Sequence, residues 1–173
     1  MKPSLSVYLI LGLLAALIIG GIVARNKKMW VVPTDNPNYQ KWAAIFDATE
    51  KNLGMPQHLL VRVAWQESRF RTDIISCQKD SPAGARGIMQ IVPRWHPNAE
   101  PCNPALAIPY AGAYLHTLKQ RFGDWEKALA AYNWGQGNLS KLDLNKSDWL
   151  DFTPGETRQY VTSVKRDLGG VLV

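Results

Sequence analysis

Glu67 is the residue whose sequence surroundings most clearly suggest chemistry. Leu60, Val63, Ala64 and Glu67 recur at spacings of three and four, so in a helix they form one stripe. Because the other members are apolar, the stripe is predicted to face the core and to withdraw the carboxylate from water. Desolvation disfavours the charged form and raises the pKa of a glutamic acid. A glutamic acid that stays protonated near neutral pH can donate its proton to a leaving oxygen.

The same spacing allows a purely structural role for this carboxylate. Glu67 could extend to the surface, or it could pair with one of three nearby arginines, Arg62, Arg69 and Arg71. Most glycan-cleaving enzymes use a second carboxylate, and the nearest candidates are Asp73 and Asp80. Neither has a clear positional signal, so the pattern favours a site with one acid.

Four polar residues further along the chain could orient a sugar. Gln90, Tyr132, Asn133 and Tyr160 can donate or accept hydrogen bonds, and aromatic faces can pack on sugar rings. Each also has an ordinary explanation, since the tyrosines could be core aromatics and the amides could lie at helix ends.

The elements that would position these residues are predicted to be helices. Apolar residues recur at helical spacing, and alternating strand patterns are scarce, so the fold is expected to be mainly α. Helix starts are predicted at Asn36-Pro37, at Pro56, at Gly87, at Asn103-Pro104 or Pro109, at Asp124 and at a capping box from Thr153 to Glu156. Long loops at 71–84, 95–104 and 135–153 are typical of segments that line a groove.

Five motifs in order resemble the soluble lytic transglycosylase (SLT) domain family, from about Tyr39 to Leu168. They are Glu67-Ser68-x-Phe70, Ser81-Pro82-Ala83-Gly84-Ala85, Gly87-Ile88-Met89-Gln90, Ala128-Leu129-Ala130-Ala131-Tyr132-Asn133 and Glu156-Thr157-x-x-Tyr160-Val161. The resemblance implies a goose-lysozyme-like helical fold with a glycan groove. It also implies cleavage of the MurNAc–GlcNAc β-1,4 bond of peptidoglycan with a 1,6-anhydro product, without a metal or cofactor.

The resemblance also assigns roles to particular residues. Glu67 would protonate the leaving oxygen and then deprotonate the C6 hydroxyl of MurNAc as that hydroxyl attacks the anomeric carbon. The residues expected to contact substrate or shape its site are Ser81, Met89, Gln90, Tyr132, Asn133 and Tyr160. Tyr160 would also lie close enough to hydrogen-bond Glu67. Two other functions stay open: a lysozyme-type hydrolase that activates water on the same fold, and a non-catalytic anchored scaffold that binds glycan or a partner.

The chain is expected to divide into an N-terminal anchor at 1–28, a linker at 29–37 and a catalytic domain at 38–173. The 20 residues from Leu5 to Ala24 carry no charge, which suits a helix that crosses a bilayer. A signal peptide cleaved after Ala24 and a buried core helix are the alternatives.

The enzymatic interpretation places the catalytic domain in the periplasm, attached to the membrane. Three basic residues after the apolar run, Arg25, Lys27 and Lys28, outnumber Lys2 before it and mildly favour a cytoplasmic domain instead. A virion-associated membrane protein and a secreted protein are further alternatives, and a larger membrane or virion assembly is a candidate partner.

Charge, histidine spacing and cysteine content bear on nucleic-acid binding, metal binding and disulfide formation. The formal net charge of the 173-residue chain is +6, but four basic residues flank the apolar run, so the rest is close to neutral and does not favour nucleic-acid binding. Its three histidines lack the spacing of metal ligands. Cys77 and Cys102 lie in predicted loops, where they could form a disulfide in an oxidising compartment or remain two free thiols.

Overall fold

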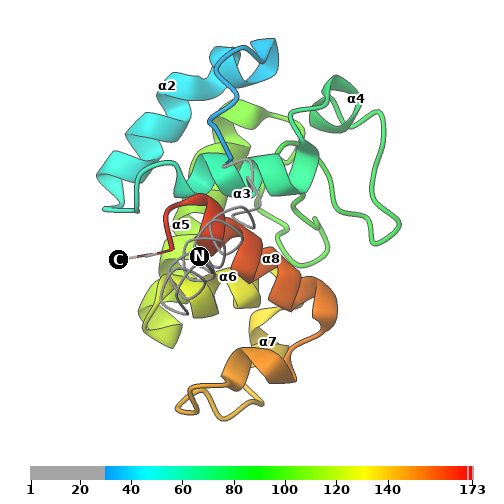
Figure 1. Ribbon diagram of the computed structural model, residues 1–173. Coiled ribbons are helices and arrows are strands. Elements are labelled where there is room, and N and C mark those ends of the chain that lie inside the picture. Colours follow the sequence, from blue (N-terminus) through cyan, green and yellow to red (C-terminus); the bar gives the residue numbers. More distant parts are fainter. Residues whose placement is uncertain (1–29, 171, 173) are drawn as a thin grey trace, which may run out of the picture.

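The structure is a computed structural model that describes residues 30–170 and 172. It is mainly helical, as expected (Figure 1). The helices are α2 (Pro37–Asn52), α3 (Leu59–Ser68), α4 (Thr72–Ile75), α5 (Pro104–Phe122), α6 (Trp125–Trp134), α7 (Gln136–Leu139), the 3-10 helix η1 (Trp149–Phe152) and α8 (Gly155–Asp167).

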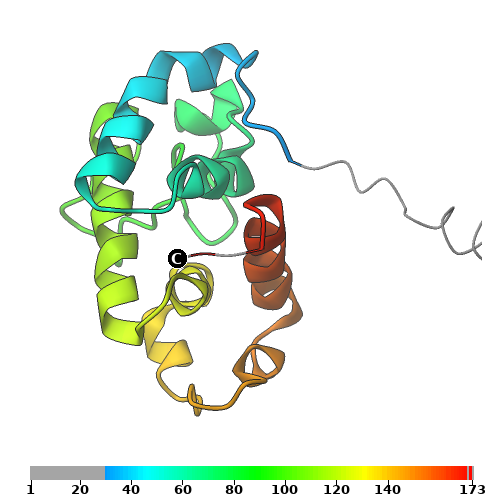
Figure 2. The same ribbon diagram turned by 60° about the vertical axis from the view of Figure 1, so that its left-hand side comes forward.

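The helices pack around one apolar core. Helix α6 contacts α5, α7 and α8, while α3 contacts both α2 and α8. In Figure 2, α5 and α8 lie on opposite sides of the body, with α6 seen end-on between them. Fully buried side chains such as Phe46, Leu60, Leu115 and Leu129 fill the space between these helices. Burial of this apolar surface is the main favourable term in folding.

Three helix starts are confirmed because their caps are local. The Asn36 side chain accepts hydrogen bonds from Asn38 N and Tyr39 N, at 2.9 and 3.2 Å, at the start of α2. Asn103 caps α5, and Asp124 caps α6. These side-chain oxygens satisfy backbone N–H groups that have no partner within the helix.

Three local predictions are wrong. The helix predicted from Gly87 is a turn, closed by an antiparallel bridge between Arg86 and Ile91. The capping box is absent, because the Thr153 hydroxyl donates to the Leu150 carbonyl and α8 begins without a side-chain cap. Helix α3 begins three residues after Pro56, following a left-handed residue.

The start of α3 is held by a side chain from another helix. Glu50 of α2 is buried, and its carboxylate accepts hydrogen bonds from the backbone N–H groups of His58, Leu60 and Val61, at 2.7, 2.7 and 3.3 Å. The negative charge also suits the positive end of the helix dipole. The helix that carries Glu67 is therefore fixed to α2 at its first turn.

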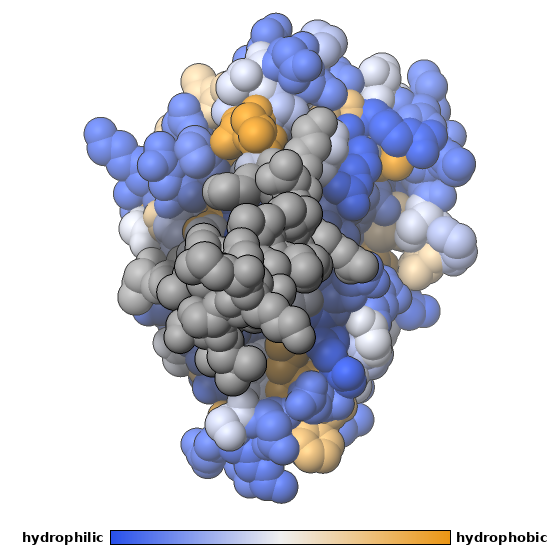
Figure 3. Space-filling view, viewed as in Figure 1, coloured by the Kyte–Doolittle hydropathy of each residue, from blue (hydrophilic) through white to orange (hydrophobic). Residues whose placement is uncertain are grey.

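The N-terminal part of the described chain belongs to this body. Trp30 and Val32, in the segment expected to be a linker, pack against the core. None of the helices formed by residues 30–170 is both long and apolar enough to cross a bilayer. The predicted anchor, Leu5 to Ala24, lies outside the described residues. Outside the grey residues, the face in Figure 3 is mostly hydrophilic, with a few scattered apolar side chains.

Candidate active site

Glu67 lies at the end of the apolar stripe predicted for α3. Leu60, Val63 and Ala64 are fully buried, and Glu67 in the last turn is half-buried. The chain then turns sharply, because Arg69 and Phe70 both have a φ of 51°. Phe70 is buried, so this turn is anchored in the core and fixes the position of the helix end.

Tyr160 of α8 donates a hydrogen bond to Glu67 Oε1 at 2.7 Å. This contact, expected from the resemblance, joins residues 93 positions apart. Burial raises the pKa of Glu67 from 4.5 to about 7, outweighing the Tyr160 hydrogen bond, which lowers it; the charge of Glu156 adds a further rise. Near neutral pH the site therefore holds a carboxyl group that can both donate and accept a proton.

The arginines that could have neutralised Glu67 have other partners. Arg62 pairs with Asp167 at 3.0 Å, and Arg71 pairs with Asp73. The Arg69 guanidinium lies over the Trp65 ring, 5.4 Å from its centroid. Desolvation therefore dominates at Glu67, and the structural interpretation by ion pairing fails among the described residues.

The candidates for a second catalytic carboxylate are also engaged elsewhere. Asp73 is held by Arg71, and Asp80 pairs with Arg86 at 3.0 Å on the surface. Glu156, exposed in the first turn of α8, is a carboxylate whose charge acts on Glu67. Sequence reasoning included it in a motif but gave it no role.

The segment 81–90 forms a compact loop through its own polar groups. The Ser81 hydroxyl accepts a hydrogen bond from Ala85 N at 2.9 Å, and Gln90 Nε2 donates to the Gly87 carbonyl at 3.0 Å. Met89 is fully buried, so its side chain supports the loop from the core side and has no surface to offer a substrate. Ser81 and Gln90 thus order the loop, whatever else they contact.

The backbone of this loop at position 87 requires glycine. Its φ is 73°, and an added Cβ would come within 1.8 Å of the Pro101 carbonyl oxygen. The segment holding Pro101 is in turn tied back by a disulfide between Cys77 and Cys102. The loop segments that hold Cys77, Gly87 and Cys102 are therefore packed together beside the helices.

Tyr132 and Asn133, at the end of α6, connect that helix to its neighbours. The Tyr132 hydroxyl donates to the Met89 carbonyl at 2.9 Å, which attaches the loop to α6. Asn133 Oδ1 accepts from the Thr157 hydroxyl at 2.8 Å, which attaches α6 to α8. Burial raises the pKa of Tyr132, and the charge of nearby Glu67 raises it further, so the phenol stays protonated.

Sequence reasoning gave no role to two buried polar residues that support the site, Thr157 and Glu50. Thr157 lies three residues before Tyr160 on α8, and that helical spacing could have indicated a shared face. Glu50 had no local signal, because its hydrogen-bond donors belong to another helix. Asp47, Glu50 and His58 also bring one ligand atom each within 4.8 Å of one another. Both oxygens of Glu50 already accept backbone hydrogen bonds, so Glu50 serves as a cap for the start of α3.

Fold and site together define a helical domain with one half-buried glutamate as its candidate acid, which accepts a hydrogen bond from a tyrosine of a second helix. The transglycosylase SLT domain model matches residues 44–151, more than half of the chain. The chain belongs to the transglycosylase SLT domain family.

Two curated relatives agree with this assignment. The peptidoglycan transglycosylase gp16 of Escherichia phage T7 is 31% identical over 143 residues, covering 77% of this chain and 10% of that protein. The membrane-bound lytic murein transglycosylase F of Pseudomonas fluorescens is 30% identical over 133 residues, covering 66% of this chain and 26% of that protein. The chain thus spans about a tenth and about a quarter of the lengths of these relatives.

Proposed function

We propose that this protein is a peptidoglycan lytic transglycosylase that cleaves the MurNAc–GlcNAc β-1,4 bond and leaves a 1,6-anhydroMurNAc end. The observation that carries this proposal is the half-buried Glu67, with a pKa of about 7 and a hydrogen bond from Tyr160. Membership of the SLT family and the names of both relatives support the same activity.

The proposed reaction uses one carboxyl group twice. Protonated Glu67 donates its proton to the glycosidic oxygen, and the bond between that oxygen and the anomeric carbon breaks. The C6 hydroxyl of the same MurNAc attacks the anomeric carbon, and its proton goes to the Glu67 carboxylate. Because no water is consumed, the product carries a new internal acetal bridge between C1 and O6, and Glu67 returns to its protonated state. A carboxyl group with a pKa near the working pH suits both steps.

Two variants test whether a single carboxylate is sufficient. Glu67→Gln should lower kcat on purified peptidoglycan by about a hundredfold to ten-thousandfold, as expected for loss of a general acid. Glu156→Gln should retain most activity, because Glu156 is exposed and acts on Glu67 only through its charge. An equal loss in both variants would indicate a two-carboxylate mechanism instead.

Product analysis separates transglycosylation from hydrolysis. Mass spectrometry of the released fragments should show anhydro ends, which are lighter than reducing ends by one water. Reducing ends as the main product would assign the protein to the lysozyme-type hydrolases. Cleavage at an unchanged rate by Glu67→Gln would instead indicate a different catalytic site, and no cleavage by the native protein would favour the non-catalytic scaffold.

The proposal extends to where the enzyme acts. Residues 1–28 would anchor it through Leu5 to Ala24, residues 29–37 would follow the anchor, and residues 38–173 would work in the periplasm. Such an enzyme would open the wall locally for growth, for a secretion apparatus, or for phage entry or exit as part of a virion. Protease added to spheroplasts should digest the catalytic domain, whereas protection of the domain would contradict a periplasmic location.

A further inference from the structure

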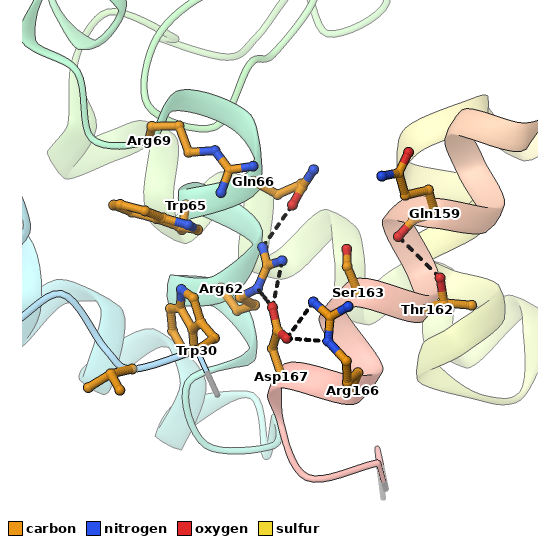
Figure 4. A pocket seen from close by; sticks show the side chains of 11 residues that line it. Trp30, Arg62, Trp65, Gln66, Arg69, Gln159, Thr162, Ser163, Arg166 and Asp167 are labelled. Carbon is orange, nitrogen blue, oxygen red and sulfur yellow. Dashed lines mark hydrogen bonds and ion pairs between the residues drawn. The ribbon is translucent and has the colours of Figure 1, made fainter. Parts of the chain in front are cut away.

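A cavity of about 600 Å³ lies between α3 and α8 (Figure 4). Helix α3 contributes Trp65 and Gln66 to one wall, together with Arg69 directly after the helix, and α8 contributes Gln159 and Ser163 to the other. The two walls stand apart in Figure 4, and the amide groups of the two glutamines lie toward one end of the gap. The cavity is large enough for several residues of an extended peptide.

The cavity and the proposed acid involve the same two helices. Gln66 directly precedes Glu67 on α3, and Gln159 directly precedes Tyr160 on α8. The hydrogen bond between Glu67 and Tyr160 joins the same two helices that form the cavity walls. Neither Glu67 nor Tyr160 lines the cavity, so a ligand could occupy it without displacing the catalytic hydrogen bond.

The lining carries an excess of positive charge. It includes three arginines and one acid, and that acid, Asp167, pairs with both Arg62 and Arg166, at 3.0 and 2.7 Å. Arg69 has no ion pair among the residues the structure describes, and its guanidinium lies over the Trp65 ring. A planar guanidinium without a carboxylate partner is a strong site for one.

The internal hydrogen bonds of the lining orient Gln66 as a donor. Arg62 Nη1 donates to Gln66 Oε1 at 2.9 Å, so the amide nitrogen of Gln66 points away from Arg62. The same cavity wall thus presents N–H groups from Gln66, in the last turn of α3, and from Arg69, directly after it. Donors combined with positive charge select an anionic acceptor over a neutral sugar hydroxyl.

We propose that this cavity binds a carboxylate of the peptide branch that MurNAc carries, so that the enzyme prefers strands with acidic peptides. This inference rests on the proposed function, because the branch must come from a strand held at Glu67. Peptide branches leave MurNAc at its C3 lactyl group, close to the scissile bond, and extend sideways from the glycan. Their carboxylates carry the negative charge that would complement the Arg69 guanidinium.

Peptidoglycan strands with free peptide carboxylates, and the same strands with those carboxylates amidated, test the inference. The wild-type protein should cleave the free form with a kcat/KM about tenfold higher, mainly through KM, as one charge-assisted hydrogen bond implies. Arg69→Met should remove this preference, so that free and amidated strands are cleaved with equal kcat/KM.

Arg71→Met is the matched control. Arg71 is an exposed arginine two residues from Arg69, it pairs with Asp73, and it does not line the cavity. This variant should keep the preference for free carboxylates. Thermal unfolding of both variants should match that of the wild type, which separates a binding effect from misfolding.

Three results would overturn the inference. Equal cleavage of free and amidated strands by the wild type would refute it and leave the proposed function intact, whereas cleavage of neither would remove both. Arg69-dependent binding to vesicles of anionic phospholipid, together with equal cleavage of the two substrates, would assign the cavity to a membrane surface.

Discussion

Replacement of Tyr160 by phenylalanine removes the hydroxyl that donates to Glu67 Oε1 at 2.7 Å. This hydrogen bond stabilises the charged carboxylate and lowers the pKa of Glu67 against the larger effect of burial. A hydrogen bond to a charged group contributes about 1.5 kcal/mol, which corresponds to about one pKa unit. The pKa of Glu67 should therefore rise by about one unit in Tyr160→Phe, from a starting value of about 7.

The assay is the pH dependence of kcat/KM on purified peptidoglycan between pH 5 and pH 9. In the proposed mechanism protonated Glu67 is the active acid, so activity should fall above its pKa, and this alkaline limb should move upward by about one pH unit. Tyr132→Phe is the control, since its hydroxyl donates to the neutral Met89 carbonyl. An unmoved limb in Tyr160→Phe, or an equal movement in both variants, would refute this explanation of the pKa.

Three further predictions concern stability. Folding raises the pKa of Glu67 above its value in the unfolded chain. The stability that this carboxyl group contributes is therefore fully present below about pH 4.5 and is lost as the pH rises through about 7. The free energy of unfolding of the wild type, measured with guanidinium, should fall by about 2 kcal/mol over this pH range, a value reduced for the partial exposure of Glu67. Glu67→Gln should show no such fall. Gly87→Ala should cost about 3 kcal/mol in the same assay, because its Cβ meets Pro101, whereas Gly84→Ala, with a similar φ of 78° and open space, should cost about 1 kcal/mol. Glu50→Gln should cost about 2 kcal/mol, because an amide cannot accept all three backbone hydrogen bonds, and a midpoint equal to wild type would contradict this.

Helix starts show how far local sequence could predict the fold. The starts at Asn36, Asn103 and Asp124 were predictable because each cap accepts a hydrogen bond from backbone N–H within the next three residues. Thr153 had the same type of signal, but its hydroxyl bonds backwards to Leu150. A capping residue has more than one backbone group within reach, and the surrounding chain selects between them.

The loop at 81–90 marks another limit of local pattern. Its sequence has helical spacing, yet Gly87 turns the chain with a positive φ and approaches Pro101 too closely for any side chain. Gly87 and Pro101 are separated by a stretch with no regular spacing of apolar residues. Contacts of this kind depend on how distant segments pack, and they leave no periodic signal in the sequence.

The sequence by itself determined the nature of the candidate acid. An apolar stripe on one helix is a local property, so the burial of Glu67 and the rise of its pKa could be expected from α3 alone. The spacing within α3 does not determine which groups meet this carboxylate: the contact with Tyr160 was expected only from the family resemblance, and the tertiary structure supplies it. Asp167 takes Arg62 away from it, and Tyr160 arrives from a helix 93 residues along the chain. Burial follows from spacing within one helix, whereas the choice of partner depends on packing between helices, which no spacing within one segment contains.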